Sequence, residues 1–243
     1  MERENVKLRI KFAKSGAMRF IGHLDVMRYF QKAIRRAEID IAYSEGFSPH
    51  QIMSFAAPLG VGLESNGEYF DIVVRSHTTA EDMKERLNGV MVPGMEVLNI
   101  TMLGEHAKNA MASVAAADYS VRFRQGYEPG FDWADRLAEF CGKPSIFVTK
   151  KTKKSEQQLD LKPGIYSMSI QTDENGVPVI RLSVDASSSG NIKPSLIMET
   201  FFKENGEELP EFALLITRED TYTNVGTAEN PKLVPLDAVG EPF

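Results

Sequence analysis

Two histidines and two carboxylates in the first fifty residues are the side chains best suited to acid–base chemistry. His23 and Asp25 stand two positions apart at the start of a helical pattern, and Glu45 and His50 follow in an irregular segment. An imidazole titrates near neutral pH, so His23 and His50 are candidate catalytic residues that act as general acid and base, for instance in RNA cleavage. Alternatively, His23 and Asp25 cap the helix, whose free N–H groups favour a carboxylate. The spacing matches no known metal motif, so we predict no metal and no cofactor.

Basic residues form a second cluster in the same region. Arg28, Lys32, Arg35 and Arg36 recur at spacings of four and three, which places them in a stripe along one helix. The first fifty residues are net positive although the whole chain carries a formal charge of −6. This asymmetry favours an anionic partner such as RNA, a nucleotide or an acidic protein face. The alternative is a solvated helix face that pairs with nearby carboxylates.

The segment 43–50, YSEGFSPH, is crowded with functional groups for a turn. Gly46 permits a positive φ, and Pro49 restricts the backbone before His50. Exposed aromatic rings in such a loop could stack on RNA bases, whereas buried rings would only fill the core beneath the loop. The predicted substrate-binding residues of the whole region are Arg19, Asp25, Arg28, Arg35, Tyr43, Glu45 and Phe47.

Composition and missing motifs exclude several classes of protein. Cys141 is the only cysteine, so an intramolecular disulfide, a four-cysteine zinc site and a cysteine-ligated cluster are all excluded. We find no glycine-rich phosphate loop, dinucleotide fingerprint, nucleophile elbow or HExxH motif. The N-terminus has no apolar segment typical of a signal peptide, and no run of roughly 20 apolar residues could cross a membrane. We therefore expect a soluble cytoplasmic protein without membrane contact.

The hydrophobic pattern of the first half predicts a β-α-β-β-α-β order. Residues 6–13 alternate apolar and basic side chains, which is typical of a half-buried strand with a wet basic face. Apolar residues then recur at helical spacing from Leu24 to Ala37. The other predicted elements are a short strand at 53–56, a strand at 68–75, a helix at 80–90 capped by Thr79, and a strand at 96–103. Glu64, Glu68 and Asp71 add carboxylates to the region, or simply make the start of a strand polar.

The second half repeats this order with one added strand. Asn175-Gly176 predicts a hairpin turn, and Gly142 and Gly206 each predict the end of a helix. We therefore predict an α+β fold of two duplicated ferredoxin-like (split β-α-β) modules, each with an antiparallel sheet and its helices on one face. The predicted division is a module at 1–104 that holds the site, a connector at 105–117, a second module at 118–223 and an extended tail at 224–243. One continuous α+β domain is the alternative.

The segment 18–72 resembles a bacterial family of unknown function, the radical SAM-linked proteins. RFIGHLD, AYSEGFSPH, SFAAPLGVGLES and EYFDI all occur in the order typical of that family, and LDLKPGI (159–165) and GNIKPSLIMETF (190–201) extend the similarity. The resemblance implies association with a radical SAM protein, because members are often fused to one or encoded near one. It does not imply that this chain performs radical chemistry, which requires three closely spaced cysteines.

Three functions fit these observations. The first is an accessory module that binds RNA or another anionic substrate for a radical SAM partner. The second is an RNA-processing or RNA-modifying enzyme that uses His23 and His50. The third is a module that only docks a protein partner.

Overall fold

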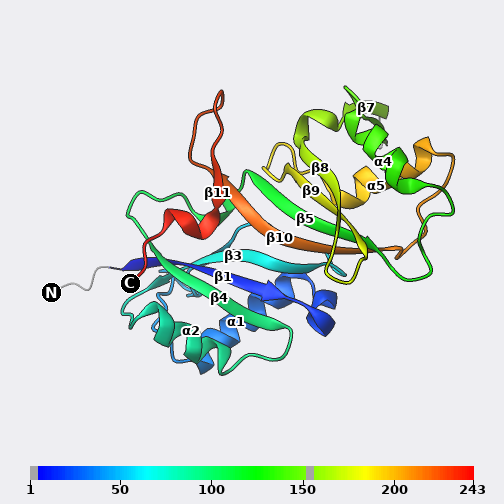
Figure 1. Ribbon diagram of the computed structural model, residues 1–243. Coiled ribbons are helices and arrows are strands. Elements are labelled where there is room, and N and C mark those ends of the chain that lie inside the picture. The colour runs from blue at the N-terminus through cyan, green and yellow to red at the C-terminus, as the bar shows by residue number, and fades with distance from the viewer. Residues whose placement is uncertain (1–4, 152–155) are drawn as a thin grey trace. The chain divides into compact units, whose positions relative to one another are not determined.

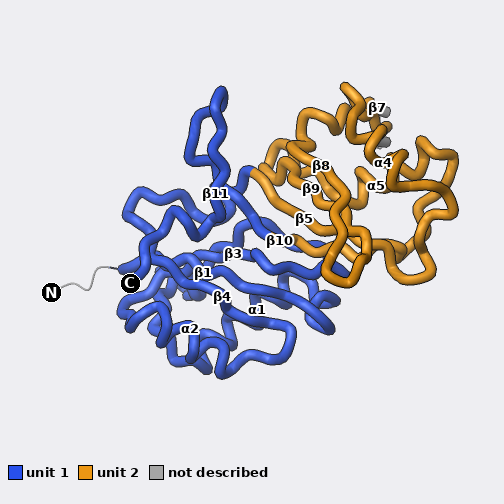
Figure 2. The backbone as a smooth tube through the Cα atoms, in the orientation of Figure 1, with its two compact units in different colours: residues 1–115, 220–243 blue, residues 116–219 orange. Residues whose placement is uncertain are grey.

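The chain folds into an α+β structure with two compact units. A computed structural model describes residues 5–151 and 156–243 (Figure 1). Unit 1 holds residues 1–115 and 220–243, and unit 2 holds residues 116–219 (Figure 2). The chain returns from unit 2 to unit 1 within strand β10 (Leu214–Asn224). In the described part of the chain, no helix has both the length and the apolar character needed to cross a membrane.

Unit 1 has the β-α-β-β-α-β order predicted for the first half of the sequence. Its elements are β1 (Val6–Lys14), η1 (Gly16–Phe20), α1 (His23–Arg36), β2 (Met53–Phe55), β3 (Glu64–Val74), α2 (Ala80–Asn88), β4 (Met95–Leu103), α3 (Ala110–Ser113), the end of β10, β11 (Leu233–Pro235) and η3 (Leu236–Val239). β1 pairs antiparallel with β3 and β4, and β2 pairs antiparallel with β3, so the strand order is β4-β1-β3-β2. The end of β10 also lies beside β3, and β11 pairs with β10.

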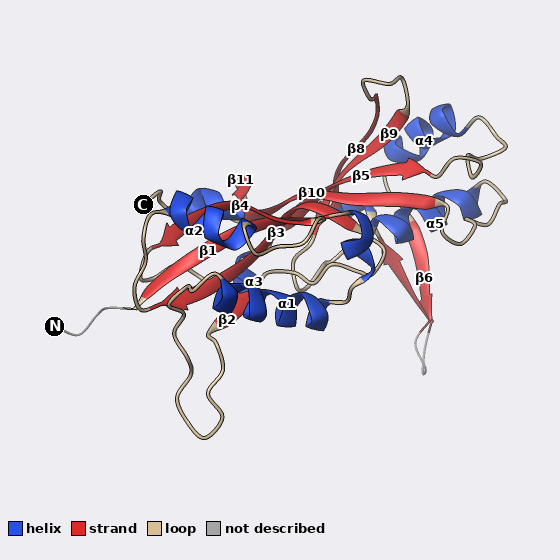
Figure 3. Cartoon of the chain, turned by 90° about the horizontal axis from the view of Figure 1, so that it is seen from below, coloured by secondary structure: helices blue, strands red, loops and turns tan. Residues whose placement is uncertain are grey.

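Helices α1 and α2 cover one face of this sheet (Figures 1 and 3). Leu8, Ile10 and Phe12 alternate along β1 and pack on the buried face of α1, which includes Phe30 and Ile34. The rings of Phe12 and Phe30 meet edge to face with centroids 4.7 Å apart. The period of two in the strand and of three to four in the helix thus produces one shared core.

Helix α2 begins where its sequence predicts. The side chain of Thr79 accepts a hydrogen bond from the backbone N–H of Asp82 at 3.2 Å, so Thr79 is the N-cap. Glu81 and Asp82 lie in the first turn, where the helix dipole favours carboxylates. The cap fixes the first residue of the helix, and Met83 and Leu87 then face the core.

The opposite face of β1 is not the wet basic surface predicted from its alternation. Arg9 is fully buried, with 0% of its surface exposed. Its guanidinium donates to both carboxylate oxygens of Asp71, from Nε at 2.8 Å and from Nη2 at 3.0 Å. Lys11 donates to Asp220 at 2.6 Å. The alternation correctly identified the side chains that point away from the helix-covered face of the sheet. It could not show that distant segments of the chain cover the opposite face.

Two distant segments of the chain cover Arg9. Its Nη1 donates to the backbone oxygen of Leu236 at 3.0 Å, and its Nη2 donates to that of Lys108 at 3.1 Å. Asp71 Oδ2 also accepts a hydrogen bond from the backbone N–H of Ala110 at 2.6 Å. The segment before α3 and the 3₁₀ helix η3 are therefore both anchored to one ion pair on the central strands.

The last twenty residues differ from the extended tail that we expected at 224–243. β11 and η3 form there, and Met102 and Glu241 exchange two backbone hydrogen bonds of 2.8 Å. The hydroxyl of Tyr69 donates to Asp220 at 2.7 Å, with Asp237 at 3.1 Å. Proline and glycine limit regular structure in this segment, yet its carboxylates and carbonyls accept hydrogen bonds from the sheet. Unit 1 consequently includes residues that we had assigned to the connector and to the tail.

The elements of unit 2 follow the predicted order, except that a strand at Glu156–Asp160 was not predicted. These are β5 (Ala116–Phe123), α4 (Trp133–Gly142), β6 (Phe147–Lys151), β7 (Glu156–Asp160), η2 (Lys162–Gly164), β8 (Ile165–Thr172), β9 (Pro178–Asp185), α5 (Pro194–Glu204) and the start of β10. The strand order is β10-β5-β9-β8, and β6 and β7 form a separate two-stranded sheet. Gly176 has a φ of 78° in the turn between β8 and β9, as the Asn-Gly pair predicted.

Asp71→Ala is expected to lower the free energy of unfolding by about 3–5 kcal/mol, because it leaves the Arg9 guanidinium buried without its counter-ion. A urea titration followed by circular dichroism measures this change. Asp25→Ala is the control, since it removes a carboxylate from an ion pair whose two side chains are about two-thirds exposed. The control should change by less than about 1 kcal/mol. Equal losses in the two variants would contradict the structural role of the buried pair.

Tyr69 should make stability fall at alkaline pH. Burial, followed by the nearby Asp220 and Asp237 carboxylates, raises the pKa of its phenol far above the ordinary value. The folded protein then keeps a proton that the unfolded chain loses above about pH 10, so the stabilisation is complete below that pH and declines above it. The free energy of unfolding should drop by up to about 1.4 kcal/mol per pH unit from this group. Tyr69→Phe should remove that component, and identical slopes for both proteins would refute the effect.

Candidate functional site

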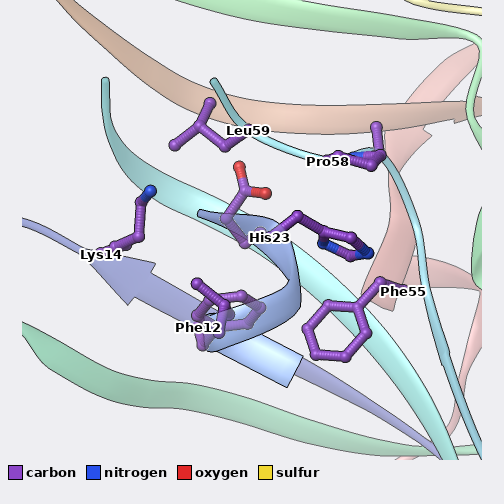
Figure 4. A pocket seen from close by; sticks show the side chains of 9 residues that line it. Phe12, Lys14, His23, Phe55, Pro58 and Leu59 are labelled. Carbon is purple, nitrogen blue, oxygen red and sulfur yellow. The ribbon is translucent and has the colours of Figure 1, made fainter. Parts of the chain in front are cut away.

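A small pocket lies where α1 begins, and His23 forms part of its wall (Figure 4). Its lining residues are Phe12, Lys14, His23, Val26, Phe55, Ala57, Pro58, Leu59 and Glu68. The space open to the centre of a water molecule is about 10 Å³. One water needs about that much, so the pocket admits a water or the tip of a ligand and not a whole ring.

Lys14 and Glu68 place charge at positions that the strand alternation assigns to the core. Lys14 follows Phe12 on the same side of β1, and Glu68 precedes Phe70 on the same side of β3. Lys14 is 2% exposed and Glu68 is 6% exposed. Buried charges are costly unless they are well satisfied, and charged groups that line a pocket are candidates for function. These two residues therefore distinguish this end of the core from the apolar remainder.

His23 is the first residue of α1 and faces the pocket rather than capping the helix. Its ring meets that of Phe55 edge to face, with centroids 5.3 Å apart (Figure 4). The N-cap is Gly22, and no side chain caps the helix. Asp25 is exposed and pairs with Arg28 at 3.3 Å. The capping alternative for His23 and Asp25 is therefore not found.

Three exposed apolar side chains belong to the segments next to the pocket residues in the sequence. Phe20, Leu24 and Val61 are 62%, 59% and 61% exposed. Gly22 lies against Val61, because a Cβ added at Gly22 would be 4.0 Å from Val61 Cγ2. The residue before α1 and the loop after β2 are thus in contact, and we call these three exposed side chains the apolar rim.

Arg19 is held close to this rim. Its Nη1 donates to Glu64 at 3.2 Å, and its guanidinium carbon lies 4.8 Å from the centre of the Phe20 ring. Its backbone oxygen accepts a hydrogen bond from Gly62 at 2.8 Å. Arg19 therefore joins the two segments that border the pocket.

The segment 43–51 forms a closed loop that projects from the fold just before β2 (Figure 3). The backbone N–H of Ser44 donates to the His50 carbonyl at 2.8 Å, and Ser44 Oγ lies 2.8 Å from His50 Nδ1. Gly46 has a φ of 105°, as its place in the loop suggested. Tyr43 and Glu45 are exposed, and Phe47 is fully exposed, so neither ring fills the core.

The base of this loop adjoins the basic stripe of α1. Gln51 Nε2 donates to the backbone oxygen of Gln31 at 3.2 Å. Arg28 and Arg35 lie three before and four after Gln31, so they share its side of the helix. Both arginines are exposed. The structure thus places Arg28 and Arg35 near the base of the loop that displays Tyr43 and Phe47.

The two candidate histidines have different surroundings. His23 lines the pocket, whose lining includes no residue of the 43–50 segment, while His50 bonds to Ser44 in the exposed loop. Among the described residues, no group of three His, Cys, Asp or Glu could hold a metal. Burial raises the pKa of the half-buried Cys141, which keeps it a thiol.

Sequence reasoning overlooked Lys14 and treated Glu68 only as one of several nearby carboxylates. A signal for both existed in the alternation itself. Lys14 continues the series Leu8, Ile10 and Phe12, and Glu68 occupies the same side of its strand as the buried Phe70. A charge at a core position is an exception to binary patterning, and such exceptions concentrate at functional sites.

Comparison with known proteins identifies the family. Residues 7–194 match the family described as "Uncharacterized protein conserved in bacteria (DUF2344)". The chain belongs to this family. No curated protein matches the DUF2344 chain in sequence.

Among solved structures, the DUF2344 chain is similar to a chain in the "Crystal Structure of a Cbf5-Nop10-Gar1 Complex". The TM-score is 0.45 and the sequence identity is 11%. The match covers 88% of this chain and 48% of that one, so the present chain spans about half of its length. A likeness of this size carries no functional argument.

Proposed function

We propose that this protein is an accessory module that binds single-stranded RNA through α1 and the 43–51 loop and does no radical chemistry itself. The observation that carries the proposal is the fully exposed Phe47 ring at a loop whose base adjoins exposed arginines of α1. An exposed aromatic ring on a loop whose base adjoins exposed cations suits a strand that offers bases and phosphates together.

The charges on α1 support an anionic partner. Lys32 and Arg35 are exposed and have no ion-pair partner among residues 5–151 and 156–243. Within the described part of the chain, the ion-pair partner of Arg28 is the exposed Asp25, and such a pair contributes little. Since the chain as a whole has a charge of −6, this local excess of cations is what would direct an RNA strand to α1.

The loop supports stacking on bases. Its ends are joined by the Tyr43–Gln51 bridge and by the Ser44–His50 hydrogen bonds. A loop that is already ordered loses less conformational entropy when a ligand binds. Phe47 is therefore displayed by a constrained backbone instead of a free chain.

The radical SAM partner is inferred from the resemblance of segment 18–72. A single cysteine cannot ligate a radical SAM cluster, so the partner would supply the chemistry and this chain would supply the RNA. We also interpret each unit as a ferredoxin-like module. The strand orders β4-β1-β3-β2 and β10-β5-β9-β8 support a duplicated split β-α-β arrangement, with β6 and β7 as an insertion.

Histidine-pair catalysis and pure protein docking are less well supported. His23 and His50 have no partner in common, which favours binding over cleavage by the pair. Exposed cations next to an aromatic loop favour a nucleic acid over a protein surface. Incubation of RNA with the purified protein should therefore leave the RNA intact, and turnover lost in both His23→Ala and His50→Ala would support the enzyme instead.

Arg28→Ala combined with Arg35→Ala should weaken binding of a fluorescent single-stranded RNA and reduce its dependence on salt. Each lost phosphate contact should lower the slope of log affinity against log salt by roughly 0.7. Fluorescence anisotropy at several salt concentrations measures both effects. Lys193→Ala combined with Lys232→Ala is the matched control, because it removes the same charge from exposed positions elsewhere. An unchanged slope in the arginine variant, or equal changes in both, would refute the role of α1.

Phe47→Ala should weaken RNA binding by about 5- to 100-fold without changing the salt slope, since stacking involves no counterion release. The fold should be unaffected because the ring is fully exposed. Phe212→Ala is the control, as Phe212 is also an exposed ring but lies in unit 2. Wild-type affinity in Phe47→Ala would remove the loop from the binding surface.

A further inference from the structure

We propose that the apolar rim of Phe20, Leu24 and Val61 is a second base-stacking platform, which holds one base of the RNA strand at the start of α1. The inference rests on the RNA-binding function proposed above and assigns it a further site, apart from the loop that displays Phe47. Every base has an apolar face, so stacking on the rim would require no particular sequence.

The rim presents apolar surface to solvent from two segments that are held together. Its three side chains are between 59% and 62% exposed. The backbone N–H of Gly62 donates to the Arg19 carbonyl at 2.8 Å, and the Val61 side chain lies 4.0 Å from a Cβ added at Gly22. Single exposed apolar side chains are ordinary on a protein surface, whereas a group of them indicates a site of interaction.

The ring of Phe20 is already ordered for stacking. The Arg19 guanidinium carbon lies 4.8 Å from the centre of this ring, and Glu64 accepts a hydrogen bond from the guanidinium at 3.2 Å. Side chains that are ordered before binding lose less conformational entropy when a ligand arrives. Aromatic rings and guanidinium planes are also the surfaces on which proteins stack unpaired RNA bases. The Arg19–Phe20 pair therefore suits a base better than a free side chain would.

The rim lies at one end of the basic stripe of α1. Leu24 precedes Arg28 by four residues and Arg35 by eleven, and eleven residues are about three turns, so the three side chains share one face of the helix. The buried residues of α1, among them Val26 and Phe30, lie on its other side. A strand that follows the exposed face meets cations along the helix and an apolar surface at its start. This charge favours a strand with phosphates over an apolar protein segment as the occupant.

The two platforms meet α1 at different points. The loop of Phe47 contacts the helix at Gln31, through the side chain of Gln51, and the loop of Val61 contacts its N-cap, Gly22. These points are nine residues apart, which is about 13.5 Å along the helix axis. The platforms would therefore hold different nucleotides of one strand, and each would add to the affinity because the strand links them.

The test uses the full chain and two fluorescent decamers at low salt, one of uridine RNA and one with the same phosphates but a stable abasic sugar at every position. Phe20→Ala should weaken binding of the uridine decamer by about 5- to 100-fold, since it removes one stacked base. It should leave binding of the abasic decamer unchanged. Arg28→Ala should weaken binding of both decamers, because its contact is to phosphate. Fluorescence anisotropy measures these affinities.

Two further variants show that the effect belongs to the ring of Phe20. Phe20→Tyr keeps an aromatic ring, so it should bind the uridine decamer as tightly as wild type. Met111→Ala is the matched control, because Met111 is a similarly exposed apolar side chain of unit 1 that lies outside the rim, at 65% exposed. It should also bind like wild type.

Photochemical cross-linking gives a readout that needs no variant. A 5-iodouridine decamer forms cross-links on irradiation with aromatic rings that its bases contact. Mass spectrometry of the irradiated wild-type complex should find cross-links at Phe20 as well as at Phe47.

The outcomes separate the two proposals. Wild-type affinity of Phe20→Ala for the uridine decamer, equal losses on both decamers, an equal loss in Met111→Ala, or cross-links confined to the 43–51 loop would overturn the second platform while RNA binding through α1 stands. Failure of the wild-type protein to bind either decamer would overturn the proposed function itself.

Discussion

The ion pair between Arg9 and Asp71 is the interaction on which unit 1 depends. It lies on the sheet face away from α1 and α2, and its remaining hydrogen bonds reach Leu236, Lys108 and Ala110. Because a buried guanidinium must have its donors satisfied, those segments are bound to the central strands. The unit is thus closed by chain that arrives from before and after unit 2, and a partly satisfied pair would leave both segments without an anchor.

The helix-covered face of the same strands is mainly apolar and ends in a small polar pocket. Its core is apolar from Leu8 to Phe12 and then ends in Lys14, with Glu68 at the corresponding end of β3. Burial of apolar side chains stabilises the packing of the helices over most of this face. The buried charges of Lys14 and Glu68 at its end stabilise the packing less than apolar side chains would, and they line a polar pocket. The sheet and the start of α1 together form the walls of this pocket.

The surface proposed to bind RNA at α1 uses two kinds of interaction, charge attraction and direct contact, which act over different distances. The exposed cations act over roughly 8 Å at physiological salt and attract any phosphate strand. Stacking of a base on Phe47 would act only at contact. The chain as a whole has a charge of −6, so the local group of cations on α1 is what would attract such a strand to this surface.

The local features of the structure could be predicted from the sequence. The β-α-β-β-α-β order, the Thr79 cap and the Gly176 turn all follow from periodicity, capping and turn chemistry within a few residues. Only the tertiary structure decided that Arg9 is buried, that Lys14 and Glu68 line a pocket with His23, and that the final segment folds onto unit 1. Arg9 meets partners 62 and 227 positions away. A pattern that repeats every two or four residues determines which way a side chain points, and it contains nothing about which distant part of the chain will lie opposite.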